Sequence, residues 1–173
     1  MMRAILYTSI NLFLLVHSGF GQNLDFEFIK NCLNYNETDL QSVLSAKNFR
    51  LIEKDHKNMG DKLINKSDYY SNKIVENQIE NAAETAVFVH SKRGKKSAFI
   101  SFTQNHSFSN FNGLEADVRK NFKKESVFQT DQFESSIVKY SDKVNFYYLF
   151  KEEETYYLIV SNYQLEEIYF HVK

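Results

Sequence analysis

The 173-residue sequence contains no proline, no tryptophan and one cysteine. A single cysteine excludes an internal disulfide, so the stability of the fold must come from packing. Without proline, the turns have to be made by asparagine, aspartate, serine and the five glycines. The 16 phenylalanines and 11 tyrosines supply the bulky apolar side chains that tryptophan would otherwise provide. A chain of this length is expected to form one domain with a sizeable core.

A charge excess of either sign is also missing, since the formal net charge is −1. Proteins that bind nucleic acid or adhere to anionic membranes generally carry clustered positive charge. The balance of charges therefore predicts neither nucleic acid nor a membrane surface as the partner.

The N-terminal residues have the pattern of a secretory signal peptide. Arg3 provides the positive charge, residues 4–16 form a short apolar run, and Gly19 and Gly21 provide the small residues of a cleavage site. We predict cleavage after Gly21, which leaves residues 22–173 as a single exported domain, secreted or periplasmic, without a membrane span. An N-terminal anchor helix is the alternative, but the run is short for a bilayer and is interrupted by polar residues.

Two stretches, residues 86–103 and 144–162, alternate as β-hairpins do. We expect turns at Arg93-Gly94 and at the acidic residues 152–154, in registers that match apolar with apolar residues on both faces. The expected pairs include Val89 with Ala98, Phe88 with Phe99, Phe146 with Val160, and Tyr147 with Ile159.

Other segments are predicted from hydrophobic periodicity. Apolar residues at three- and four-residue spacing predict helices over residues 24–34, from a cap at Thr38 to Asn48, and over residues 114–122. Alternation predicts strands over residues 49–55, 126–131 and 134–140.

Two segments are less regular. In residues 57–81, a strand over residues 68–75 and a helix over residues 70–83 both fit the pattern. Residues 164–173 form a short tail whose Leu165, Ile168 and Phe170 are suited to docking on the sheet edge.

Each half of the chain therefore has the same expected order, a helical part followed by four strands. The first such unit spans about residues 24–104 and the second about residues 112–163. We predict an α+β domain made of two helix-plus-four-strand repeats, with an antiparallel sheet that has its helices on one face and its other face open. The expected core on the helix side comprises Val87, Val89, Ile100, Phe146, Tyr148, Leu158 and Val160 with Leu44, Leu114 and Val118.

This plan resembles the tandem-repeat fold of the β-lactamase-inhibitor proteins. The matching points are a helix followed by Asn48-Phe49-Arg50-Leu51 and closed by the Arg93-Gly94 hairpin, then a helix followed by Glu125-Ser126-Val127-Phe128 and closed by the acidic hairpin. The four cysteines of that inhibitor are absent, and the first half has a longer middle segment. The resemblance implies a concave sheet face that grips a partner protein.

Motifs for catalysis and for metal binding are absent. No G-x-S-x-G motif occurs, and Cys32 falls on the apolar stripe of its helix, which is typical of an unreactive thiol. The histidines His56, His90, His106 and His171 have no partner at metal-ligand spacing. We therefore predict no catalytic residue, metal or cofactor. An exported hydrolase is less favoured, since it would need a site assembled from scattered residues.

One apolar surface is predicted to bind. Aromatic pairs of both hairpins fall on the sheet side away from the helices, where polar residues are expected. We predict an exported, non-enzymatic, inhibitor-like module that binds a protein partner, or a second copy of the chain, through this surface. The alternatives are that loops, the tail or residues 57–81 cover this surface, or that the sheet is buried on both faces. The alternative function is a carrier for a small ligand or lipid, with an aromatic-lined cavity. The predicted binding residues are Phe88, His90, Phe99, Tyr147, Leu149, Tyr157 and Ile159.

Overall fold

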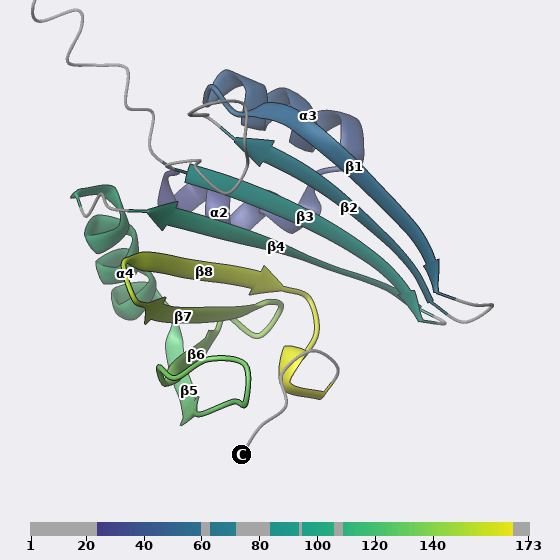
Figure 1. The fold of residues 1–173 in the computed structure, drawn as a ribbon. Coiled ribbons are helices and arrows are strands. Elements are labelled where there is room, and N and C mark those ends of the chain that lie inside the picture. Colours follow the sequence, from purple (N-terminus) through teal and green to yellow (C-terminus); the bar gives the residue numbers. More distant parts are fainter. Residues whose placement is uncertain (1–23, 60–62, 72–83, 94, 106–108, 168–173) are drawn as a thin grey trace, which may run out of the picture.

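A computed structural model describes residues 24–59, 63–71, 84–93, 95–105 and 109–167 (Figure 1). The predicted signal peptide, as well as Ile168 and Phe170 of the tail, lie outside these ranges. The first half contains α2 (Phe26–Asn31), η1 (Cys32–Asn34), α3 (Glu37–Ala46), β1 (Arg50–Met59), β2 (Leu63–Ser71), β3 (Glu84–Arg93) and β4 (Lys95–Asn105). The second half contains α4 (Ser109–Asn121), β5 (Lys123–Phe128), β6 (Ile137–Ser141), β7 (Phe146–Glu152), β8 (Thr155–Ser161) and η4 (Leu165–Glu167).

The strands form one eight-stranded sheet in the order β1-β2-β3-β4-β8-β7-β6-β5. Every neighbouring pair is antiparallel, and β4 and β8 pair to join the strands of the two halves. The predicted α+β class with an antiparallel sheet is confirmed.

The two N-terminal helices begin at capping side chains. Asp25 accepts a hydrogen bond from the Phe28 backbone N–H at 2.7 Å and starts α2. Asn36 accepts from the Asp39 N–H at 2.9 Å and starts α3, so the predicted cap at Thr38 is wrong. Asn36 has the extended backbone that a cap requires, whereas Thr38 already lies in the first helical turn.

The remaining differences from the predicted elements concern their bounds. Helix α4 begins at Ser109, five residues before the predicted start, and thereby adds Phe111 to its buried stripe. Strand β1 continues to Met59 and pairs with β2, which ends at Ser71. The alternative helix is wrong at Tyr70 and Ser71, which are in β2; its residues 72–83 lie outside the described ranges.

Most buried apolar side chains form one group, the larger core cluster, which joins the helices to alternate residues of the strands. Its helical members are Phe28, Ile29, Cys32, Leu40, Leu44, Phe111, Leu114 and Val118, with Phe122 directly after α4. Its sheet members are Tyr70, Ala86, Ile100, Phe102, Tyr140, Tyr147, Leu149, Tyr156, Leu158 and Val160, with Phe49 just before β1.

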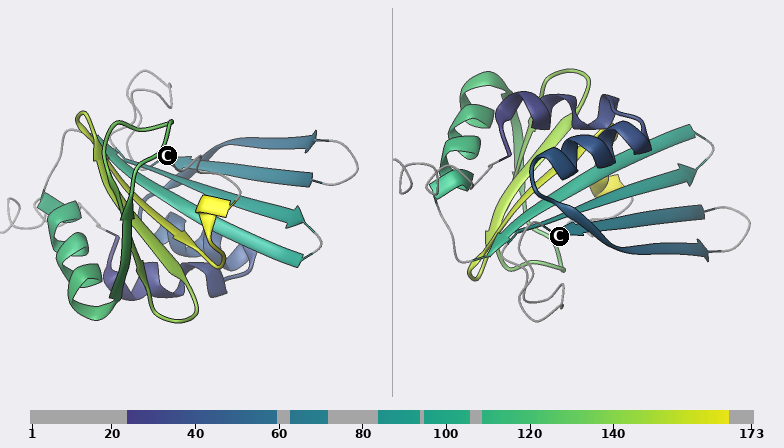
Figure 2. Two further views of the ribbon diagram at one scale, coloured as in Figure 1. Left: turned by 90° about the horizontal axis from the view of Figure 1, so that it is seen from below. Right: turned by 90° about the horizontal axis from the view of Figure 1, so that it is seen from above.

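A second group, the smaller core cluster, contains Ile137, Tyr148, Phe150, Ile159 and Leu165. Successive side chains of a strand point to opposite faces, so Tyr148 and Ile159 lie on the other face from Tyr147 and Leu158. We call the face that carries the smaller core cluster the second face. Figure 2 shows η4, which carries Leu165, on the opposite side of the sheet from α2 and α3.

Both hairpins are present, but both predicted registers are wrong by one residue. Val89 pairs with Phe99 rather than Ala98, and Phe146 pairs with Ser161 rather than Val160. A one-residue shift moves the side chains of one strand to the opposite face relative to its partner. The observed registers also match apolar with apolar residues, since Tyr147 faces Val160. Like-with-like matching therefore could not distinguish the two registers.

The shift also divides the predicted core. Six of its members lie in the larger core cluster as predicted, namely Ile100, Leu158, Val160, Leu44, Leu114 and Val118. Tyr148 instead belongs to the smaller core cluster, and the partly buried Phe146 packs against that cluster. Val89 is buried outside both clusters, and Val87 is partly exposed.

Candidate functional site

The predicted binding residues do not share one face. Tyr147 is fully buried and Leu149 nearly so in the larger core cluster, against which Phe88 also packs. Ile159 belongs to the smaller core cluster on the second face, and the partly exposed Tyr157 packs against that cluster. The side chains of His90 and Phe99 lie outside the description. The one-residue error in both predicted registers explains why these residues lie on two faces. Of the predicted surface, only the residues on the second face remain candidates for binding.

One row of directly paired residues crosses all eight strands on the second face. It consists of Glu53, Tyr69, Val87, Ser101, Ile159, Tyr148, Lys139 and Ser126. In the first half, Tyr69, Val87 and Ser101 are partly exposed. In the second half, Ile159, Tyr148 and Lys139 are buried. The second face is thus covered mainly over β6, β7 and β8.

Part of this cover is the loop between β5 and β6. The Thr130 hydroxyl accepts hydrogen bonds from the N–H groups of Gln132 and Phe133, and the Glu152 carboxylate accepts from those of Glu134 and Ser135. The hydrogen bonds from Glu134 and Ser135 hold the pKa of the Glu152 carboxyl below its usual range. They also fix the loop on the sheet.

The fixed loop completes a group of three aromatic rings, the aromatic patch. Phe150 and Tyr157 stack in parallel with ring centroids 4.6 Å apart. Phe133 of the loop lies 4.6 Å from Phe150 and 5.8 Å from Tyr157. Phe133 and Tyr157 are partly exposed, whereas Phe150 is buried beneath them.

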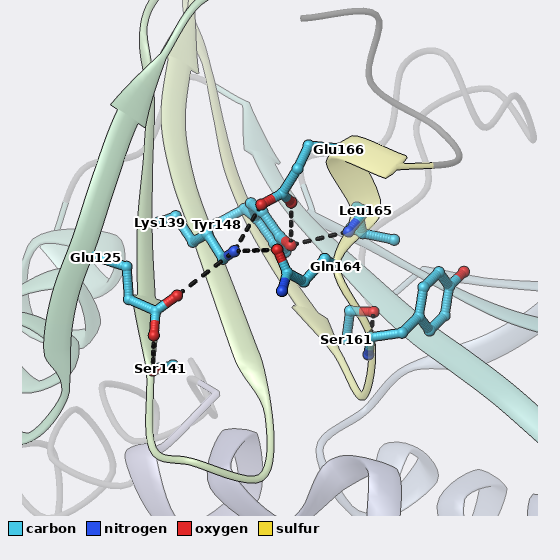
Figure 3. A network of polar contacts seen from close by, with 9 residues as sticks. Glu125, Lys139, Ser141, Tyr148, Ser161, Gln164, Leu165 and Glu166 are labelled. Atoms are coloured by element: carbon cyan, nitrogen blue, oxygen red, sulfur yellow. Dashed lines mark hydrogen bonds and ion pairs between the residues drawn. The ribbon is translucent and has the colours of Figure 1, made fainter.

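The other cover is the chain segment that follows β8, which is held by Lys139. Lys139 is only 4% exposed, and its ammonium lies 3.0 Å from Gln164 Oε1, 2.5 Å from Glu166 Oε1 and 3.4 Å from Glu125 Oε2 (Figure 3). The ring of Phe146 approaches it at 4.5 Å. A buried charge is tolerated only when it is paired and hydrogen-bonded in this way.

Tyr148 provides the second anchor for the same segment. Its hydroxyl donates to Glu166 Oε2 at 2.7 Å and accepts from the Leu165 N–H at 2.9 Å. Burial, together with the hydrogen bond to the Glu166 carboxylate, raises the pKa of Tyr148. Leu165 is 1% exposed in the smaller core cluster. The predicted docking of Leu165 is therefore confirmed in outline, but on the second face rather than at an edge.

Glu125 approaches Lys139 from the neighbouring strand. It lies at a β-bulge, between the paired residues Lys124 and Ser126, and accepts a hydrogen bond from the Ser141 hydroxyl at 2.6 Å. That hydrogen bond, followed by the contact with Lys139, lowers the pKa of Glu125.

This arrangement favours anchoring over covalent chemistry. A nucleophilic lysine needs space for a reacting group beside its nitrogen, and the Lys139 ammonium is enclosed by three acceptors and a ring. Among the described residues, no group of three histidine, cysteine, aspartate or glutamate side chains is placed to hold a metal ion.

A separate cleft of about 490 Å³ lies between α2, the end of α4 and the β6–β7 turn. Two aromatic residues, Phe26 and Phe122, contribute to its walls. The rest of its lining is polar or charged: Glu27, Lys30, Asn121, Lys123, Ser141, Asp142 and Lys143.

The sequence prediction missed Lys139, Tyr148 and Glu166 as a group. One signal was present, because Lys139 lies between apolar residues in the strand sequence Ile-Val-Lys-Tyr-Ser. A charged residue in such a position must either reach solvent or find a partner. Its partner Glu166 is 27 residues away and could not be identified from spacing.

Within the described ranges, no helix is suited to crossing a membrane, and the longest of them, α4, has 13 residues. Comparisons with protein families, with curated proteins and with solved structures found no match to this chain.

Proposed function

We propose that the protein is an exported, non-enzymatic binding module that recognises another protein through the second face of its sheet. The observation that carries this proposal is the aromatic patch, in which the loop and the sheet hold Phe133 and Tyr157 partly exposed. Tyrosine and other aromatic side chains typically carry much of the energy of protein interfaces.

The partly exposed residues beside the patch extend the proposed surface into the first half. Tyr157 is paired with Thr103 on β4, and the row Tyr69, Val87 and Ser101 continues across β2, β3 and β4. This mixture of aromatic, aliphatic and hydroxyl side chains is suited to a protein surface. Export, with a mature chain that begins at Gln22, is part of the proposal and would be tested by the intact mass of the exported protein.

The two edges of the sheet are less suited to binding. The edge strands β1 and β5 each contain a register shift, between Leu51 and Glu53 and between Lys124 and Ser126. Bulges and charged residues at edges discourage the addition of another strand. Recognition by a face is therefore favoured over recognition by strand addition.

The finer architecture belongs to the same proposal. We infer that the two halves are helix-plus-four-strand repeats with their helices on one face, as the resemblance to the β-lactamase-inhibitor proteins implies. The inference is supported by the order of elements and by the mirrored strand order β1-β2-β3-β4 and β8-β7-β6-β5.

Site-specific crosslinking would test the proposed surface. A photo-reactive phenylalanine derivative at position 157 should form a discrete adduct with another protein in the native envelope fraction. The same group at position 144, where Val144 is 69% exposed on the β6–β7 turn, provides the control. Equal adducts at both positions, or none at position 157, would reject the proposed surface; an adduct of twice the chain mass would indicate a second copy.

The carrier alternative rests on the 490 Å³ cleft, whose size is within the range of small-molecule sites. Charged side chains such as Glu27, Lys30 and Asp142 stand among its lining residues, which suits a lipid tail poorly. A lipid of defined mass retained by the exported protein in native mass spectrometry would favour the carrier.

A further inference from the structure

The segment Gln164–Glu166 occupies the second face as a short peptide ligand would. Lys139 and Tyr148 contact the two oxygens of the Glu166 carboxylate, one oxygen each. Gln164 adds a third side chain through its hydrogen bond to Lys139. Figure 3 shows these groups converging from the sheet on the segment.

The groups that hold the segment are fixed by the sheet. Lys139 and Tyr148 are directly paired on β6 and β7, so both side chains project from the same face at the same level. Lys139 also contacts Glu125, which is in turn held by Ser141. The carboxylate site is therefore built from β5, β6 and β7, and η4 only occupies it.

The site also recognises the residue that precedes the glutamate. The Leu165 side chain is buried with Ile137, Phe150 and Ile159, and its backbone N–H donates to the Tyr148 hydroxyl. One hydroxyl thus contacts the leucine backbone and the glutamate side chain together. This geometry selects an apolar residue followed directly by a glutamate.

The apolar part of the site is continuous with the aromatic patch. Phe150 belongs to the smaller core cluster together with Leu165, and it also stacks on Tyr157. A partner bound to the patch would therefore lie next to the Lys139–Tyr148 pair. Only residues 162–164 connect β8 to η4, so the segment has a high effective concentration, and a competitor needs the additional contacts that the patch offers.

We propose that the Lys139–Tyr148 pair is a recognition site for an apolar residue followed by glutamate, which the protein partner supplies in place of Leu165 and Glu166. The chain's own segment is then an exchangeable occupant that the partner displaces. This inference rests on the proposed function, because it assigns a sequence motif to the partner of the same face.

The test uses a fluorescent peptide with the sequence of residues 161–167, Ser-Asn-Tyr-Gln-Leu-Glu-Glu, and the full exported chain. In the double variant Leu165→Ala/Glu166→Gln, the internal occupant is weakened, and fluorescence anisotropy should show peptide binding at least ten times tighter than to the unchanged chain. Glu115→Gln on α4, which breaks the exposed ion pair with Arg119, is the charge-matched control and should bind no better than the unchanged chain.

Two changes establish specificity. Adding Lys139→Met to the double variant should weaken peptide binding at least tenfold. A peptide in which glutamine replaces both glutamates should also bind the double variant at least tenfold more weakly. Equal binding in either case would overturn the inference, as would no binding at millimolar peptide to a double variant that circular dichroism shows to be folded. If the double variant does not fold, the test is hydrogen exchange of the Leu165 amide in the unchanged chain. Excess peptide should accelerate this exchange, because it displaces the segment that protects the amide. An exchange rate that excess peptide leaves unchanged would overturn the inference.

The outcomes also separate this inference from the proposed function. A partner that crosslinks at position 157 and binds the Lys139→Met chain with unchanged affinity would support the surface and refute the motif. Specific peptide binding without any crosslink at position 157 would support the recognition site and refute the proposed surface.

Discussion

Lys139 and Tyr148 are direct neighbours across β6 and β7, and each binds a different oxygen of the Glu166 carboxylate. Through this pair, a segment that is distant in sequence is fixed on the second face. The contact brings a buried ammonium, a buried phenol and a partly exposed carboxylate into one hydrogen-bonded group.

Replacing Lys139 by alanine should destabilise the fold substantially. The change leaves a void and deprives two glutamates of their shared cation, so we expect a loss of about 3 kcal/mol in the free energy of unfolding. Urea denaturation measures this loss. Arg119→Ala, which removes an exposed ion pair, is the control and should cost about 0.5 kcal/mol or less. Similar losses for both variants would show that Lys139 is not a buried anchor.

Tyr147 should behave as a core residue and Tyr157 should not. The Tyr147 ring stacks on Phe122 with centroids 4.0 Å apart, and its hydroxyl donates to Asp142. We expect Tyr147→Ala to cost about 3 to 5 kcal/mol, whereas Tyr157→Ala, at a partly exposed site, should cost about 1 to 2 kcal/mol. Denaturation curves that show similarly small losses for both variants would support the original assignment, which placed both tyrosines on the open face.

Ser141→Ala should reduce stability in a pH-dependent manner. The Ser141 hydroxyl, followed by Lys139, holds the pKa of Glu125 below its ordinary value of 4.5. A carboxyl with a lowered pKa in the folded state stabilises the fold above its unfolded pKa, and this contribution disappears as the pH falls through the folded pKa. We expect a loss of about 1 kcal/mol at pH 7 that shrinks below about pH 4. If the loss of stability caused by Ser141→Ala stays constant between pH 7 and pH 3, it comes from packing and not from the hydrogen bond to Glu125.

Cys32 should be unreactive in the folded protein. It is fully buried in the larger core cluster, and burial raises the pKa of its thiol. Because the thiolate is the reactive form, a thiol reagent such as Ellman's reagent should label the native chain far more slowly than the chain in urea. Rapid stoichiometric labelling under native conditions would contradict this position for Cys32.

Local patterns predicted the helices and most strands because each depends on a few neighbouring residues. The spacing of Leu40 with Leu44, and of Leu114 with Val118, placed the buried faces of α3 and α4 correctly. Hairpin register depends on which of two adjacent pairings the turn selects. In the second hairpin, Glu152 pairs with Thr155 across a two-residue turn in which Glu153 has φ 50°. In this hairpin, the general preference for two-residue turns would have selected the observed register. In the first hairpin it would not, because Arg93 pairs with Lys95 and the predicted two-residue turn at Arg93-Gly94 is not formed.

The candidate site was less predictable because its parts are distant in sequence. Tyr157 and Ile159 were assigned to a binding surface from their hairpin, and both lie on the second face. Their neighbour Phe133 is brought there by hydrogen bonds of Glu152 to a loop, which no periodic pattern reports. The same holds for Glu166, whose position depends on Lys139 and Tyr148.

The affinity of the crosslinked partner for Tyr157→Ala tests recognition through the second face most directly. With the partner purified, calorimetry would compare the unchanged chain, Tyr157→Ala and the exposed control Val144→Ala. A tyrosine at the centre of an interface is worth about 2 kcal/mol, so Tyr157→Ala should bind roughly 30-fold more weakly, with Val144→Ala unchanged. Unchanged affinity of a folded Tyr157→Ala chain would contradict recognition through this face.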